Sequence, residues 1–118
     1  MNYNKINLDG KRFGSISNSG SGEVDQETIF FYHQRDDILW AEYQGGPIRF
    51  GTLTGLVLPG GELDFRYAHV NRDNEIMTGR CLSTPELLPD GRLRFHEQWQ
   101  WSSGDRSGGS SIIEEIAS

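Results

Sequence analysis

The sequence predicts an all-β domain, an antiparallel up-and-down meander that closes into a barrel of roughly eight strands. Apolar and polar residues alternate in one segment after another, and no sustained i, i+3, i+4, i+7 stripe indicates a helix. Glycine and aromatic residues are both abundant, with 15 Gly, 6 Phe, 3 Trp and 4 Tyr, which suits strands and turns. The 118 residues make one domain, 1–118.

The alternating segments follow one another between turn signals. Ile6 and Leu8 precede Asp9-Gly10, a dipeptide typical of hairpins. Links that contain Gly, Pro, Asn or Asp then separate the predicted strands, which are 11–17, 28–33, 38–44, 48–58, 63–70, 75–84, 92–101 and 111–116. Links of about two to six residues join antiparallel neighbours, because parallel strands need a long crossover.

A meander of this length must hide its two edges, and pairing the first strand with the last does so. Closure of about eight strands leaves an interior that side chains fill or that holds one small ligand. Gly14, Gly51 and Gly55 are candidates for the bends that closure needs. A sandwich of two sheets is the alternative architecture.

Segment 92–101 shows most clearly which side chains face the interior. A period of two separates its polar even positions from the odd positions Leu93, Phe95, Glu97, Trp99 and Trp101. The odd set is therefore predicted to point inward, and it contains one carboxyl group. Glu97 on an apolar inner face requires a partner, a raised pKa or water in the cavity.

The same argument places Tyr67 and His69 inside, together with Leu63 and Phe65. Segment 75–84 is ambiguous, since both of its faces mix polar and apolar residues. If the even face is interior, Arg80 is a candidate partner for Glu97. The remaining walls are expected to come from Phe30, Tyr32, Trp40 and Tyr43.

Polar groups among aromatic walls are the usual composition of a small-molecule site. The predicted ligand-binding residues are Tyr43, Tyr67, His69, Arg80, Glu97, Trp99 and Trp101. The competing interpretation of their polar members is a buried network that fixes strand register.

No catalytic residue, metal or cofactor is predicted. His96-Glu97 lacks the second histidine of the zinc-protease pattern, since the fifth position is Gln100, and the segment is a strand rather than a helix. The single cysteine, Cys81, excludes an internal disulfide, and no spacing places it against a histidine. The Gly/Ser-rich stretches 18–22 and 102–111 match neither a P-loop nor a dinucleotide fingerprint.

The net charge of -6 argues against nucleic acid and anionic membranes as partners. The first residues show no basic head followed by an apolar run, and no apolar stretch has the length of a membrane helix. We therefore expect a soluble cytoplasmic protein.

Several segments resemble a family of small, largely uncharacterised bacterial proteins. They are 7–13 (NLDGKRF), 43–46 (YQGG), 78–86 (TGRCLSTPE) and 96–101 (HEQWQW), and the resemblance covers nearly the whole chain. The resemblance implies a streptavidin-like or lipocalin-like barrel. It also brings the label N-acetylglutamate synthase, but the sequence lacks the glycine turn before a helix that holds acetyl-CoA.

Three functional hypotheses follow. The first is a non-enzymatic module that binds a small, partly polar ligand. The second is a small enzyme with Glu97 as acid or base, assisted by His69 or Cys81. The third is a structural protein that forms a homodimer through a surface containing Phe30 and Tyr32.

Overall fold

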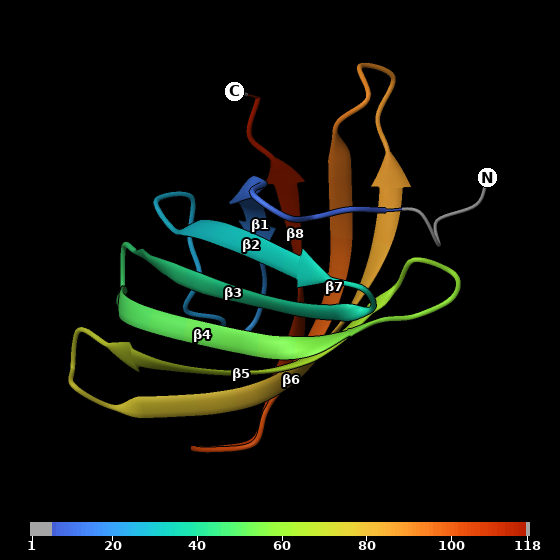
Figure 1. The fold of residues 1–118 in the computed structure, drawn as a ribbon. Helices are drawn as coiled ribbons and strands as arrows, with labels where there is room; N and C mark the ends of the chain where they lie inside the picture. Colours follow the sequence, from blue (N-terminus) through green and yellow to red (C-terminus); the bar gives the residue numbers. More distant parts are fainter. Residues whose placement is uncertain (1–5, 118) are drawn as a thin grey trace.

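The computed structural model describes residues 6–117, which form a closed antiparallel barrel of eight strands (Figure 1). The strands are β1 (Arg12–Asn18), β2 (Ile29–Arg35), β3 (Ile38–Gly45), β4 (Ile48–Val57), β5 (Leu63–Asn71), β6 (Ile76–Leu87), β7 (Leu93–Trp101) and β8 (Gly108–Glu115). Each strand pairs with the next, and β1 pairs with β8, with Ser15 opposite Ile113. The predicted up-and-down barrel is confirmed, and the sandwich alternative is not the fold.

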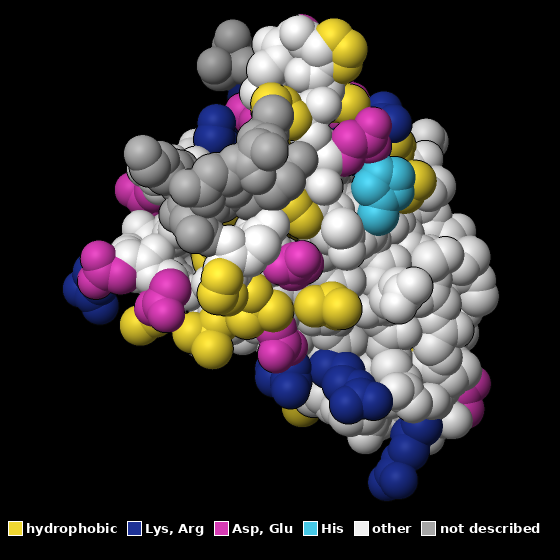
Figure 2. Space-filling model, turned by 90° about the vertical axis from the view of Figure 1, so that its right-hand side faces the viewer, with side chains coloured by type: hydrophobic (Ala, Val, Ile, Leu, Met, Phe, Trp, Pro, Cys, Tyr) yellow, Lys and Arg dark blue, Asp and Glu magenta, His cyan; other side chains and the backbone are white. Residues whose placement is uncertain are grey.

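The alternation expected in β7 is present: its odd-numbered side chains are buried and its even-numbered ones are partly or fully exposed. On the face that Figure 2 shows, hydrophobic side chains lie in several places among charged side chains, other side chains and backbone. The alternation in β7 is what a period of two produces when one face of a strand is buried and the other is exposed.

Three of the four expected wall assignments, those of Phe30, Tyr32 and Tyr43, are correct and that of Trp40 is wrong. Phe30 and Tyr32 point inward and are at most 6% exposed, so they cannot form the dimer surface proposed from the sequence. Phe31, between them, is the outward residue. Trp40 was expected inside but lies on the outer face, where its ring stacks on His33 at 5.5 Å, because Leu39, Ala41 and Tyr43 take the inward positions of β3.

The chain before β1 also differs from the prediction. Asp9-Gly10 forms a turn, with the Lys11 N–H donating to the Leu8 carbonyl at 3.0 Å, but residues 6–8 form no strand. The Leu8 N–H instead donates to the side-chain oxygen of Gln34 at 2.9 Å, which replaces a strand partner. The Leu8 side chain is fully buried, so this segment contributes to the core rather than to the sheet.

The interior has two unlike halves. Around the middle and towards Leu8, the rings of Phe13, Tyr32 and Phe95 pack with centroids 5.1 Å (Phe13–Tyr32) and 5.5 Å (Phe13–Phe95) apart. At the other end, the rings of β5 and β7 surround a space that is not filled, and the connection between β1 and β2 borders it. The fold therefore places the candidate site at one end of the barrel.

Candidate ligand-binding cavity

The unfilled space is a cavity of about 50 Å³ inside the barrel. It has room for about three to five water-sized groups. Residues 22–24, in the loop 19–28 that joins β1 to β2, form part of its wall. Most of the remaining wall is aromatic and consists of Phe30, Tyr43, Phe65, Tyr67, Trp99 and Trp101.

Every residue predicted for the site lines this cavity except Arg80. Arg80 is exposed on the outer face of β6 and donates to the Gln100 side-chain oxygen at 2.9 Å. The expected Arg80–Glu97 pair is therefore wrong. The odd face of β6 is the interior one because Gly79, Cys81 and Ser83 leave space for the rings of β5 and β7, whereas an inward Arg80 would require burial of a guanidinium.

Glu97 forms the inner end of the cavity and is buried without a cation beside it. The hydroxyls of Ser83 and Ser111 donate to its two carboxyl oxygens at 2.8 and 3.0 Å. The Cys81 sulfur lies 3.7 Å from one of these oxygens. Burial raises the pKa of Glu97, and the hydrogen bonds from Ser83, Ser111 and Cys81 only partly oppose this effect. Burial therefore shifts the ionisation equilibrium of Glu97 towards the protonated, uncharged acid.

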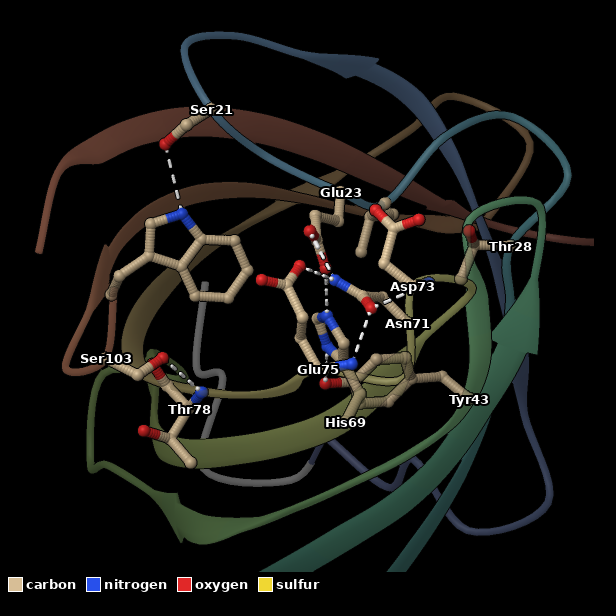
Figure 3. A network of polar contacts seen from close by, with 12 residues as sticks. Ser21, Glu23, Thr28, Tyr43, His69, Asn71, Asp73, Glu75, Thr78 and Ser103 are labelled. Atoms are coloured by element: carbon tan, nitrogen blue, oxygen red, sulfur yellow. Dashed lines mark hydrogen bonds and ion pairs between the residues drawn. The ribbon is translucent and has the colours of Figure 1, made fainter. Parts of the chain in front are cut away.

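His69 lies near the mouth of the cavity, between a phenol and a carboxylate (Figure 3). Its Nδ1 is 2.9 Å from the Tyr43 hydroxyl, and its Nε2 is 2.7 Å from a carboxylate oxygen of Glu23. Burial lowers the pKa of His69, although Glu23 opposes this, and burial raises the pKa of Tyr43. The neutral arrangement that follows has the Tyr43 hydroxyl donating to Nδ1 and Nε2–H donating to Glu23.

Glu23 is the residue of this site that sequence reasoning missed. Its second oxygen accepts from the Asn71 amide at 3.0 Å, so one carboxylate ties the loop 19–28 to two residues of β5. Nothing in the spacing around Glu23 predicts these contacts. The one feature of the sequence that indicates an approach of this loop to the interior is Val24, an apolar residue in a polar loop. Its side chain packs against the core.

The same loop region is also tied to β7 through the two indoles. The Trp99 N–H donates to the Asn18 side-chain oxygen at 3.1 Å, and the Trp101 N–H donates to the Ser21 hydroxyl at 3.0 Å. The rings that form the cavity wall therefore also hold its cover.

Cys81 is buried at the inner end of the cavity, next to Ser83 and Glu97. Burial raises the pKa of its thiol, and the nearby carboxyl group adds to the effect. Because the thiolate is the nucleophilic form, this environment makes Cys81 a packing residue rather than an activated nucleophile.

Replacing Glu23 with Gln is expected to increase opening of the loop 19–28 about fivefold, since an amide oxygen is a weaker partner for His69 than a carboxylate. Hydrogen–deuterium exchange of the loop amides measures this opening. Glu27→Gln is the matched control, because Glu27 is in the same loop and its side chain is exposed. Equal exchange rates in the two variants would show that the Glu23–His69 contact does not hold the loop.

The closed meander and the internal aromatic cavity define a class of protein: small β-barrels whose interior is open at one end. Within this class, residues 6–116 match the family described as avidin-like protein, and the chain belongs to this family. No curated protein and no solved structure matches the chain.

Two further findings concern residues 6–117. They contain no cluster of three or more His, Cys, Asp or Glu side chains that could hold a metal ion. They also contain no helix with the length and apolar character needed to cross a membrane.

Proposed function

We propose that the protein is a non-enzymatic binding module that holds a small molecule inside the barrel. The observation that carries this proposal is the cavity itself, which has aromatic walls and polar groups at both ends. Glu97 provides hydrogen bonds at the inner end, and the His69–Glu23 pair provides them at the mouth. Membership in the avidin-like family supports a role in small-molecule binding.

The arrangement of rings suits a ligand with flat or aliphatic parts. The Trp99 and Trp101 centroids are 5.6 Å apart with their planes at 58°, and the Tyr67 and Trp101 rings meet edge to face at 5.8 Å. These rings offer apolar surface at several angles around one small space. The ligand must be small, or part of it must extend towards the loop 19–28, because the closed cavity is only about 50 Å³.

Tryptophan fluorescence with a compound library tests the proposal. Trp99 and Trp101 line the cavity, whereas Trp40 lies on the outer face, so Trp40→Phe removes background without touching the site. A true ligand is expected to change the emission equally in the wild type and in this variant, and to raise the unfolding temperature. If no compound of any charge does either at millimolar concentration, the binding function is refuted.

A small enzyme with Glu97 as the acid or base is the second candidate. The raised pKa of Glu97 in a cavity is the kind of perturbation found at catalytic acids, and His69 lines the same cavity. Any turnover of a bound compound is expected to disappear in Glu97→Gln. Turnover that persists in this variant would exclude Glu97 as the acid or base.

A homodimer and a cytoplasmic location stay proposals. Because Phe30 and Tyr32 are buried, a dimer would have to use outward side chains such as Phe31, or the cross-strand neighbours Ile38 and Leu56, which are each 41–47% exposed. Sedimentation at micromolar concentration tests the dimer, and a Leu56→Lys variant is expected to shift the equilibrium to monomer if these side chains form the contact.

A further inference from the structure

We propose that the ligand of this cavity is a small protonated amine, whose ammonium group lies beside Glu97 and against the surrounding aromatic faces. The inference rests on the proposed binding function and specifies its chemical class. Three features of the cavity support a cation over an anion or a neutral molecule.

The first feature is the charge of the lining. Two carboxyl groups line the cavity, Glu97 at the inner end and Glu23 at the mouth, and among residues 6–117 no Lys or Arg lines it. Arg80, the cation that an anionic ligand would have used, lies on the outer face of the barrel. An anion would therefore enter a space without Lys or Arg, whereas a cation would meet the Glu23 carboxylate and a second carboxyl group, Glu97, that can ionise beside it.

The second feature is the environment of Glu97. Its oxygens accept hydrogen bonds from the hydroxyls of Ser83 and Ser111 and from the Cys81 thiol, so the carboxyl group has partners but no counter-ion. An ammonium group would supply that counter-ion and would allow Glu97 to ionise. Charge-assisted hydrogen bonds of this kind are about twice as strong as neutral ones.

The third feature is the aromatic wall. Cations bind over the faces of Trp, Tyr and Phe, with Trp the strongest, and a desolvated site strengthens the attraction. The Trp99, Trp101 and Tyr67 rings meet at steep angles, with interplanar values of 58° and 66°. Rings arranged at such angles can present more than one face to a single group, as in the aromatic cages that recognise ammonium ligands.

Binding is expected to depend on pH through Glu97. When the amine binds, the Glu97 proton leaves to the buffer and the ammonium group keeps its own, so about one proton is released per ligand. The other titratable groups around Glu97 do not oppose the release of its proton, because each is uncharged in the free protein or negative. These groups are Tyr32 on β2, Tyr43 on β3, Tyr67 and His69 on β5, Cys81 on β6 and Glu23 in the loop 19–28. Affinity should rise with pH below the folded pKa of Glu97 and level off above it, until the amine itself loses its proton, near pH 10 for an alkylamine such as the Lys side chain.

The test compares three probes of nearly equal size: propylammonium, 1-propanol and propionate. Each is titrated into the full chain to millimolar concentration, with tryptophan fluorescence and calorimetry as readouts. We expect propylammonium to bind about tenfold more tightly than propanol, and propionate to bind weakest. Calorimetry in two buffers with different ionisation enthalpies should show release of a proton with propylammonium alone.

Glu97→Gln keeps the shape of the protonated acid but cannot ionise, so the ratio of propylammonium to propanol affinity should fall towards one. Glu42→Gln is the matched control, since Glu42 lies on the outer face of β3 beside His33, and it should leave the ratio unchanged. If Glu97→Gln fails to fold, the probe series and the proton release in the wild type still decide the question.

The two proposals fail in different ways. If propanol or propionate binds as tightly as propylammonium, the amine inference is wrong and the binding function stands. If propylammonium binds more tightly but releases no proton, or if Glu97→Gln keeps the tenfold preference, the role given to Glu97 is overturned. If no probe and no library compound binds, both proposals are refuted.

Discussion

Replacing Gly51 with Ala is expected to destabilise the barrel by about 2–3 kcal/mol, the upper part of the range for overpacking a filled interior. A methyl group at Gly51 would overlap the Tyr43 ring, with Cε2 at 2.5 Å, and would lie 2.7 Å from the His69 Cβ. The His69 Cβ is attached to the backbone of β5 and cannot move without it. Urea unfolding monitored by fluorescence measures the loss.

Gly14→Ala is the matched control for this prediction. Gly14 also lies in a strand, but a methyl group there meets only ordinary contacts, the nearest being Ile116 at 3.6 Å. Alanine there should be neutral or stabilising by about 0.5–1 kcal/mol, because glycine loses more conformational entropy on folding. Gly51→Ala should in addition increase exchange in the loop 19–28, since the Tyr43 hydroxyl is bonded to His69 and His69 is bonded to Glu23. Equal stability of the two variants would contradict this close packing.

Replacing Glu97 with Gln is expected to change how stability depends on pH. The pKa of Glu97 in the folded protein is raised above its ordinary value of 4.5. The folded state therefore holds the proton more tightly than the unfolded state. The stability that Glu97 contributes is fully present below about pH 4.5, its ordinary pKa, and is lost as the pH rises through the folded pKa.

Glutamine cannot ionise, so the variant should gain stability relative to the wild type as the pH rises through this window. The difference between the two proteins should approach a slope of about 1.4 kcal/mol per pH unit, which corresponds to one proton. Urea unfolding at a series of pH values measures it. A difference that does not change between pH 4 and pH 9 would mean that the pKa of Glu97 is not raised in the folded protein.

His69 contributes a pH dependence of the opposite sign. Its pKa is lowered from 6.5 by burial, so its contribution to stability is present above that value and is lost as the pH falls through the folded pKa. Comparing Glu97→Gln with the wild type removes this contribution, because both proteins contain His69. The slope of the difference therefore reports on Glu97 alone.

The sequence could predict the barrel because polar and apolar residues alternate clearly wherever one face is buried and the other is wet. Segment 92–101 is the clearest example, and it correctly placed Glu97 beside Trp99 and Trp101. Segment 75–84 lacked this contrast, since its inward residues Gly79, Cys81 and Ser83 are small or polar. The face of this segment that points inward is decided by the volume of the rings on neighbouring strands. A local sequence pattern contains no information about that volume.

The contacts at the mouth could not be predicted for a related reason. Glu23 and His69 are 46 residues apart in the chain, and their contact depends on how the loop 19–28 crosses the barrel end. Polar loops carry no periodic signal. The sequence therefore identified the wall of the cavity, formed by strands, but not the cover, formed by a loop.

The burial of Leu8 gives the interior a single entrance. With that side chain and the rings of Phe13 and Phe95 packed into the far half, whatever occupies the cavity must arrive and leave by the same route. Passage in both directions then shares one barrier. A substitution that only loosens this entrance should speed capture and release by the same factor and leave the equilibrium affinity unchanged.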